Sequence, residues 1–271
     1  MDELDTAEAL AVAREATAEG IAALEEARER TGRGQAAEKR PRDLVTEADH
    51  EAERRIVARL REAFPGHAYL AEEGGGEKGG RYRWVIDPLD GTTNYVHDFP
   101  VYAVSVALFD DEEPVVGIVV DVARGEWFTG RAGAGAAVDR GDPGEARPIS
   151  VSENDRLPTA LLATGFPFRY PEQLDRYLDT FRALFRQTSD VRRAGSAALD
   201  LAWVASGRVD GFWELGLSLW DIAAGELLVL EAGGRVTDWA GGTSHRESGW
   251  IASGNPTVHD AIVRTLEPWA P

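Results

Sequence analysis

The stretch Trp84–Tyr95, with the sequence WVIDPLDGTTNY, is the most informative part of this chain. Its apolar beginning predicts the end of a buried strand, which carries two carboxylates, Asp87 and Asp90, on either side of a Pro-Leu pair. Burying an unpaired carboxylate is very costly, so two of them three residues apart require a positive partner. The simplest positive partner for clustered oxygen ligands is Mg²⁺.

The residues that follow Asp90 predict a turn that binds phosphate. Gly91, Thr92 and Thr93 resemble the start of a helix, where free backbone N–H groups bind anions. A metal cluster beside a phosphate site suggests metal-assisted hydrolysis of a phosphate ester. Taken alone, however, the same residues also fit an ordinary turn in which Asp90 caps a helix.

The composition of the chain narrows the class of protein. Its 271 residues are 43% hydrophobic and 28% charged, which is typical of a globular protein with one large domain or two modest ones. The net charge of −18 argues against direct contact with nucleic acid or an anionic membrane. The chain has no cysteine, no signal-peptide pattern at its start and no apolar run long enough to span a bilayer. We therefore expect a cytoplasmic protein.

Apolar spacing along the chain predicts mixed helices and strands, arranged in stacked layers. Helices are expected over residues 4–30, 46–64, 173–187, 197–206, 222–232 and 256–266. The runs Tyr102–Phe109, Val115–Val120 and Glu126–Thr129 predict an antiparallel meander. We expect one catalytic domain over residues 1–271, with two substructures, about 1–145 and 146–271, that meet near the glycine-containing stretch 141–147.

Several acids are predicted to lie at strand ends, each next to a glycine or a helix start. They are Glu72, Asp87, Asp90, Glu214 and Asp221. Ligands collect at such ends, so folding is expected to bring these acids together. The carbonyl of Leu89, which the turn leaves outside any ladder, adds one more oxygen ligand. Two metal ions about 4 Å apart would then hold both the attacking water and the leaving oxygen.

A threonine and two acids are candidates for activating that water. The Thr92 hydroxyl is placed to orient it, and either Asp49 or Glu72 would accept its proton. Each acid also has a structural interpretation. Asp49 would close a capping box, Glu72 would belong to a solvated acidic pair, and Asp221 would cap a helix. No single motif decides between these interpretations, but their combination favours metal-dependent phosphate chemistry.

The combination of motifs resembles the inositol monophosphatase family of lithium-sensitive, magnesium-dependent phosphatases. The motifs are Asp43–Asp49 (DLVTEAD), Glu72-Glu73, Asp87–Thr93 (DPLDGTT) with Asn94-Tyr95-Val96-His97, Gly195-Ser196-Ala197-Ala198 and Trp220–Gly225 (WDIAAG). They occur in family order and cover most of the chain. The segment Thr164–Phe168, TGFPF, resembles the bacterial inositol-1-monophosphatase branch.

The resemblance implies an α+β fold layered α-β-α-β-α, and a homodimer. It implies two or three Mg²⁺ ions held by Glu72, Asp87, the Leu89 carbonyl, Asp90 and Asp221. Thr92 would position the water, with Asp49 and Glu72 as the acids that support catalysis. The substrate would be bound by Glu72, Asp90, Gly91, Thr92, Gly195, Ser196, Ala197, Glu214 and Asp221. The chain departs from the family at Glu38, where a lysine is frequent; Lys39 is its neighbour.

The implied activity is hydrolysis of inositol 1-phosphate by direct attack of water. A fructose-1,6-bisphosphatase, a dual-specificity sugar phosphatase, or an enzyme for histidinol phosphate or nucleotide 3′-phosphates would use the same metal motifs. Glu214 favours a neutral polyol over a second phosphate, although the loop arginines Arg169 and Arg193 can approach the site. The alternative that is not an enzyme function is a regulatory, protein-binding role, since some bacterial relatives act in transcription complexes.

Overall fold

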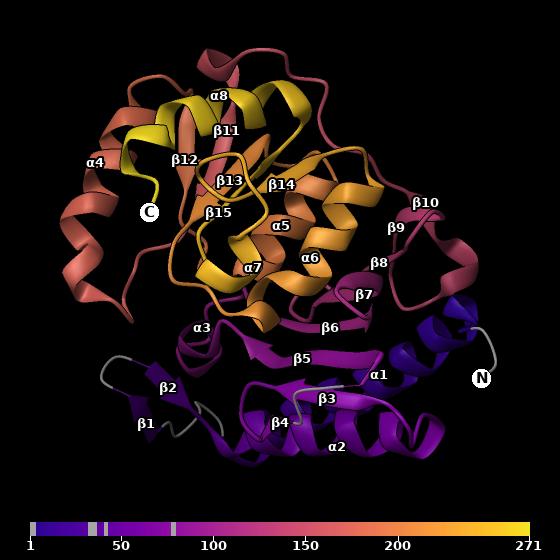
Figure 1. Ribbon diagram of the computed structural model, residues 1–271. Coiled ribbons are helices and arrows are strands. Elements are labelled where there is room, and N and C mark those ends of the chain that lie inside the picture. Colours follow the sequence, from indigo (N-terminus) through magenta and orange to yellow (C-terminus); the bar gives the residue numbers. More distant parts are fainter. Residues whose placement is uncertain (1–3, 32–36, 41–42, 77–79) are drawn as a thin grey trace.

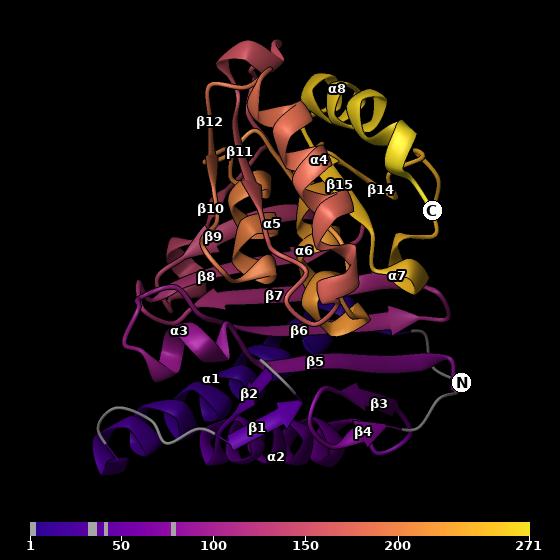
Figure 2. The ribbon, with the colours of Figure 1, turned by 90° about the vertical axis from the view of Figure 1, so that its left-hand side faces the viewer.

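Helices and sheets alternate in layers through this structure, a computed structural model that describes residues 4–31, 37–40, 43–76 and 80–271 (Figures 1 and 2). The helical layers are α1 (Thr6–Thr31) with α2 (Glu47–Ala63), α5 (Ala197–Ala205) with α6 (Leu219–Glu231), and α4 (Leu174–Phe185) with α8 (Pro256–Leu266). One sheet lies between the first and second of these layers, and the other between the second and third. The predicted α-β-α-β-α arrangement of an α+β protein is confirmed.

The larger sheet has eight strands in the order β10-β9-β8-β7-β6-β5-β3-β4. They are β3 (Ala68–Ala71), β4 (Gly75–Gly76), β5 (Tyr82–Asp90), β6 (Ala103–Asp110), β7 (Glu113–Asp121), β8 (Glu126–Arg131), β9 (Gly135–Asp139) and β10 (Arg147–Pro148). Each strand from β5 to β10 pairs antiparallel with the next, so the predicted meander is confirmed. Both faces of this sheet are buried: in β6, Val104 and Val106 face α1 and α2, whereas Ala107 and Phe109 face α5 and α6.

The smaller sheet has the order β12-β11-β13-β15-β14. Its strands are β11 (Leu161–Thr164), β12 (Asp190–Arg192), β13 (Gly211–Glu214), β14 (Arg235–Thr237) and β15 (Ile251–Gly254). In β13, Phe212 packs toward α5 and α6 and the next residue, Trp213, packs toward α4 and α8. This alternation places the last residue of the strand, Glu214, on the same side as Phe212.

The strand that carries Asp87 is longer than expected. We expected it to end at Ile86, but β5 continues to Asp90, and its pairing with β6 shifts register between Asp87 and Asp90. In a regular strand, residues three apart point to opposite faces. The register shift removes that constraint and allows both carboxylates to turn toward one place.

The expectation that Asp221 opens a helix is wrong by three residues. Helix α6 starts at Leu219, with Ser218 as its N-cap, and Asp221 lies within the first turn. Its carboxylate accepts a hydrogen bond from the backbone N–H of Ser218 at 2.6 Å. Leu219 and Trp220 did not look like a helix start in the sequence. They begin α6 because Ser218 caps them.

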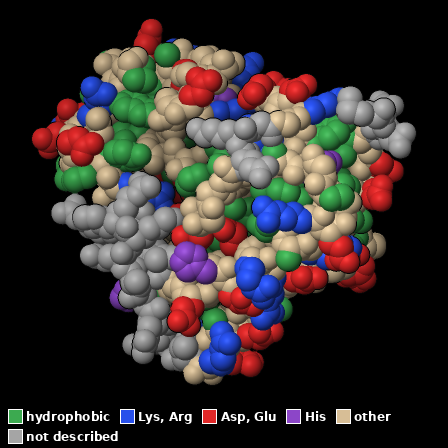
Figure 3. Space-filling view, turned by 60° about the horizontal axis from the view of Figure 1, so that its bottom comes forward, with side chains coloured by type: hydrophobic (Ala, Val, Ile, Leu, Met, Phe, Trp, Pro, Cys, Tyr) green, Lys and Arg blue, Asp and Glu red, His purple; other side chains and the backbone are tan. Residues whose placement is uncertain are grey.

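The remaining elements are short. They are β1 (Ala37–Arg40) paired with β2 (Asp43–Val45), α3 (Thr92–Val96) and α7 (His245–Ser248). Glu38 and Lys39 lie in β1, and the structure does not describe their side chains. In the part of the chain that is described, no helix is long and apolar enough to cross a membrane. Acidic and basic side chains both occur on the face shown in Figure 3. Two ion pairs, Arg55–Glu26 and Arg59–Glu15, join α2 to α1.

Candidate active site

Three carboxylates from distant parts of the chain converge at one point. Asp87 and Asp90 come from β5, and Asp221 comes from the first turn of α6. Each offers an oxygen, and these oxygens all lie within 4.8 Å of one another. Oxygens at this spacing can share one cation or bridge two. The sequence predicted this convergence, and the register shift in β5 makes it possible.

The acids line a cavity of about 290 Å³. Among its lining residues are Glu72, Asp87, Leu89, Asp90, Gly91, Thr92, Gly195, Ser196, Ala197, Glu214 and Asp221. These are all the predicted metal and substrate positions. Asp49 is the one predicted site residue that does not line the cavity, because it lies behind Thr92. The cavity has room for a small phosphate ester, although it is at the lower end of the usual range for ligand sites.

The electrostatics of the cavity favour a bound cation. Burial raises the pKa of Asp87 well above its ordinary value, and the charges of Glu72, Asp90 and Asp221 raise it further. Burial, followed by the charge of Asp221, raises the pKa of Asp90 to about 7. Carboxylates this close repel one another when ionised. A divalent cation would relieve both the burial penalty and the repulsion.

The donor set fits Mg²⁺. It consists of carboxylate oxygens and the Leu89 carbonyl, the hard oxygen ligands that this ion prefers. Positive charge already approaches the acids from the loop after β11, because Arg169 Nη2 lies 3.5 Å from Glu72 Oε1 and Arg169 Nη1 lies 3.7 Å from Asp221 Oδ2. Both distances are long for charge-assisted hydrogen bonds, so this arginine screens the charge of the acids from a distance.

Thr92 joins the acids to a buried carboxylate behind them. Its hydroxyl lies 3.1 Å from both Asp49 Oδ1 and the carbonyl oxygen of Leu89. Asp49 also accepts hydrogen bonds from the backbone N–H and the hydroxyl of Thr46, so the predicted capping box is present as well. Burial raises the pKa of Asp49 to about 6. The capping-box interpretation of Asp49 is therefore confirmed, and the same carboxylate contacts Thr92; its part in activating water stays a prediction.

The turn after Asp90 brings the two halves of the chain into contact. Gly91 is the N-cap of the five-residue helix α3 and has φ of 90°, which favours glycine. A Cβ atom there would lie 3.1 Å from the carbonyl oxygen of Gly195. The Asn94 side chain spans the same junction, since its Nδ2 donates to the carbonyls of Val101 at 2.7 Å and Ala194 at 3.0 Å. We quoted Asn94 only as part of a motif, and this bridging contact was not predicted.

The start of α5 holds Asp90 in place. Ser196 Oγ donates to Asp90 Oδ2 at 2.6 Å, and the backbone N–H of Ala198 donates to the same atom at 2.8 Å. Ser196, predicted to contact substrate, thus contacts a predicted metal ligand. Glu214 lies at the other end of the cavity, where burial raises its pKa to about 8. Gly165 lies directly against it, since a Cβ atom there would be 2.1 Å from Glu214 Oε1.

The sequence analysis missed one acid of the cavity. Asp200 lies in the first turn of α5 and lines the cavity between the Asp90 and Glu214 ends. A signal was present in the sequence, because Asp200 is the single charged residue in the otherwise apolar helix AALDLAWVA. A charged residue is rarely buried in such a helix without a partner.

Comparison with known proteins agrees with this geometry. The model of the inositol monophosphatase family matches residues 5–268. The Nus factor SuhB of Pseudomonas aeruginosa is 49% identical over 240 residues, which are 86% of each chain. The inositol-1-monophosphatase of Mesorhizobium japonicum is 41% identical over 235 residues, again 86% of each.

Solved structures show the same fold. The inositol monophosphatase from Anabaena (Nostoc) sp. PCC 7120 superposes with a TM-score of 0.86 and 39% identity, covering 99% of this chain and 98% of that one. The extragenic suppressor protein suhB from Bartonella henselae gives a TM-score of 0.89 with 37% identity, covering 96% of this chain and 98% of that one. The chain therefore belongs to the inositol monophosphatase family.

Proposed function

We propose that this protein is a Mg²⁺-dependent phosphomonoesterase that hydrolyses inositol 1-phosphate to inositol and phosphate. The observation that carries the proposal is the convergence of Asp87, Asp90 and Asp221 on a cavity that also contains Glu72 and Thr92. The 41% identical relative named inositol-1-monophosphatase supports the choice of substrate.

The residues that would hold two or three Mg²⁺ ions are Glu72, Asp87, Asp90, Asp221 and the carbonyl of Leu89. Bound Mg²⁺ would supply a Lewis acid that activates water and neutralises the leaving oxygen. The protein holds these ligands ready. Ser196 and Ala198 fix Asp90, and Ser218 fixes Asp221.

Thr92, Asp49 and Glu72 would handle the attacking water. Because Thr92 donates its hydroxyl proton to Asp49, its oxygen is free to accept a hydrogen bond from water. Glu72 lies on the cavity wall and would accept the proton that the water loses on attack. The new P–O bond forms as the ester P–O bond breaks, and the inositol oxygen leaves with a proton from solvent.

Cavity residues outside the acid cluster would bind the polyol. Gly195, Ala197 and Glu214 line the cavity, and Glu214 would offer a carboxyl group to the hydroxyls. A phosphate-release screen tests the whole proposal, with inositol 1-phosphate, fructose 1,6-bisphosphate, histidinol phosphate and nucleotide 3′-phosphates as substrates. We expect Mg²⁺-dependent release that is fastest from inositol 1-phosphate and inhibited by Li⁺. Faster release from fructose 1,6-bisphosphate would contradict the substrate, and no release from any of these esters would contradict the enzyme.

The relative from Pseudomonas aeruginosa named Nus factor SuhB supports a second, regulatory role. We propose that this chain also binds a protein of the transcription machinery, with no direct contact to nucleic acid because of its charge of −18. A pull-down with a catalytically inactive Asp221→Asn variant tests this role. Recovery of transcription proteins would support it, and their absence with both variant and wild type would contradict it.

Exposed apolar side chains on α4 are the candidate contact for the proposed homodimer. Helix α4 exposes Leu174, Leu178 and Phe185, and exposed apolar side chains that gather on one surface often mark protein contacts. Light scattering measures the mass directly: a mass of about 59 kDa, twice 29.4 kDa, is expected, and a monomer mass would contradict the dimer.

A further inference from the structure

Asp200 is a buried acid of the cavity that the proposed mechanism does not use. Its side chain is 1% exposed and belongs to the cavity lining. Its Oδ1 atom has no hydrogen-bond partner within the described residues. A buried polar atom without a partner costs folding free energy, so its presence in a native protein calls for an explanation.

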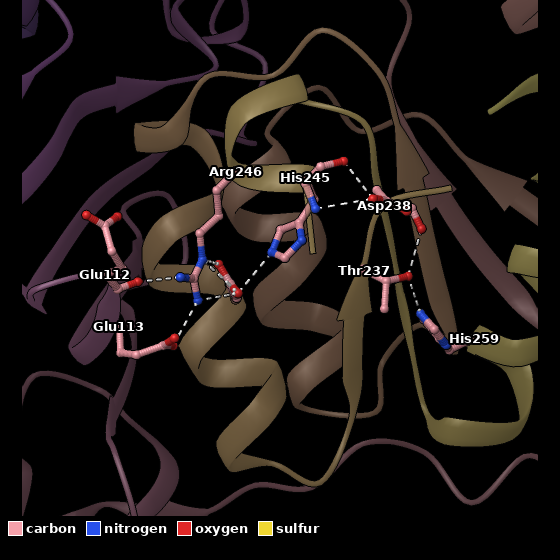
Figure 4. Close-up of polar contacts among 9 residues, drawn as sticks. Glu112, Glu113, Thr237, Asp238, His245, Arg246 and His259 are labelled. Atoms are coloured by element: carbon pink, nitrogen blue, oxygen red, sulfur yellow. Dashed lines mark hydrogen bonds and ion pairs between the residues drawn. The ribbon is translucent and has the colours of Figure 1, made fainter. Parts of the chain in front are cut away.

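The buried acids away from the cavity are satisfied. Asp238, labelled in Figure 4, is one of them. It accepts hydrogen bonds from the backbone of Ala240, Gly242 and Ser244 and from the Ser244 hydroxyl. Asp139 pairs with Arg14 through both of its oxygens. The chain therefore satisfies buried carboxylates where they serve the fold, and Asp200 differs from them.

Asp200 lies among the charged side chains that line the cavity. Burial raises its pKa well above the ordinary value, the charges of Glu214 and Asp90 raise it further, and Arg193 lowers it. Arg193 and Gly195 also line the cavity, and a Cβ atom on Gly195 would be 2.6 Å from Arg193 Nη1. Asp200 and Asp87 are equally buried, and both line the cavity. Burial to this degree is therefore compatible with contact between a side chain and a ligand there.

We propose that Asp200 is a specificity-determining residue that, beside Glu214, accepts a hydrogen bond from a hydroxyl of the polyol part of the substrate. This inference rests on the proposed phosphatase function and names a recognition group for it. The unsatisfied Oδ1 atom receives its partner when a polyhydroxylated phosphate ester occupies the cavity. A phosphate ester without hydroxyl groups leaves it unsatisfied.

Two substrates and a matched control test this inference. The variant Asp200→Asn keeps the shape of the side chain, and Asp200→Ala removes it. Each is assayed with inositol 1-phosphate and with p-nitrophenyl phosphate, which lacks hydroxyl groups. We expect kcat/KM for inositol 1-phosphate to fall roughly 10-fold in Asp200→Ala, which loses the hydrogen bond, and to fall less in Asp200→Asn, whose amide oxygen still accepts one. The value for p-nitrophenyl phosphate is expected to change less than about threefold, within ordinary context effects.

Thermal unfolding provides the second readout. Asp200→Asn removes a buried, unsatisfied carboxylate and is expected to keep or raise the unfolding temperature, whereas the matched Asp238→Asn variant is expected to lower it. Equal losses with both substrates would overturn the inference, because Asp200 would then act on the phosphate end. No loss with either substrate would also overturn it. If the wild type itself releases no phosphate from polyol esters, the proposed function fails, and the role of Asp200 fails with it.

Discussion

Helix α6 carries two buried acids, five residues apart, whose surroundings are opposite. In its first turn, Asp221 joins Asp87 and Asp90 in a cluster of like charges. One turn further along, Glu226 meets two basic side chains of α7, His245 and Arg246 (Figure 4).

Glu226 is held from several sides. His245 Nε2 donates to its Oε1 atom at 2.9 Å, and Arg246 Nε donates to its Oε2 atom at the same distance. Arg246 also reaches Glu113 Oε2 at 3.3 Å and the carbonyl of Glu112, which ties α6 to the β6–β7 turn. Burial alone would raise the pKa of Glu226, but the hydrogen bonds from His245 and Arg246 lower it overall.

The difference shows that the partners of a buried acid indicate whether it serves the fold or a ligand site. Glu226 receives its positive partners from within the chain, so its role is to join elements of the fold. Asp87 and Asp90 have raised pKa values because both are buried and, in addition, because acids of the same cluster lie beside them. We propose that a bound cation supplies the positive charge that such a cluster requires.

The largest effect is expected at Asp221. Asp221→Asn removes a proposed metal ligand, so kcat/KM should fall by about 10³-fold or more, as when a group that stabilises transition-state charge is lost. The unfolding temperature of the metal-free protein should not fall, because the substitution also removes like-charge repulsion. Enzyme assays and calorimetry on the same preparation check both outcomes; a large loss of stability would show that Asp221 serves the fold.

The opposite result, a loss of stability with activity kept, is expected when Arg246, the partner of Glu226, is replaced. Arg246→Met leaves Glu226 without its main partner, and breaking a buried ion pair costs about 3–5 kcal/mol of unfolding free energy. Chemical denaturation measures this loss. The folded fraction should keep its kcat. As a control, the double variant Glu226→Leu with Arg246→Met should recover part of the stability, and an unchanged single variant would contradict the assignment.

Magnesium should stabilise the site but not the ion pair. At a concentration one hundred times its Kd, a ligand that binds only the folded state adds about 2.7 kcal/mol. We expect Mg²⁺ to raise the unfolding temperature of the wild type and of Arg246→Met alike. The same titration should leave Asp221→Asn nearly unchanged, and an equal rise in that variant would place the stabilising ion elsewhere.

A smaller effect is expected from pH. The folded pKa values of Asp49, about 6, and Glu214, about 8, lie above their ordinary values of 3.8 and 4.5. The folded protein therefore holds these protons to higher pH than the unfolded chain, and stability falls as pH rises from about 4 to about 8. Glu214→Gln should reduce the difference between the unfolding temperatures of the metal-free protein at pH 5.5 and pH 8.5. An unchanged difference would mean that Glu214 does not titrate in this range.

The sequence was enough to predict the layers, the meander and the acids of the cavity other than Asp200, because each has a local signature. The apolar runs of β6 to β8 are spaced by turns, and the residues around Asp87 and Asp90 form a motif. The register shift in β5 was not predictable, since it depends on pairing with β6, a strand whose sequence does not specify where a bulge falls.

Residues that act through tertiary contacts were the hardest to identify. Asn94 connects Val101 to Ala194, one hundred residues away, and its neighbours in sequence give no sign of this. Asp200 is an intermediate case: its place in an otherwise apolar helix signals burial, but only the packing of α5 shows that it lines the cavity. Such roles depend on which surfaces meet, and local patterns do not encode that.

The central claim is that the acid cluster on β5 and α6 is a divalent-cation site. A crystal structure of the wild-type protein grown with Mn²⁺, a stand-in for Mg²⁺ with a strong anomalous signal, tests it most directly. We expect anomalous peaks between Asp87, Asp90 and Asp221, with the Arg169 guanidinium displaced from Glu72 and Asp221. Peaks confined to surface carboxylates, with this cluster unchanged, would contradict the account.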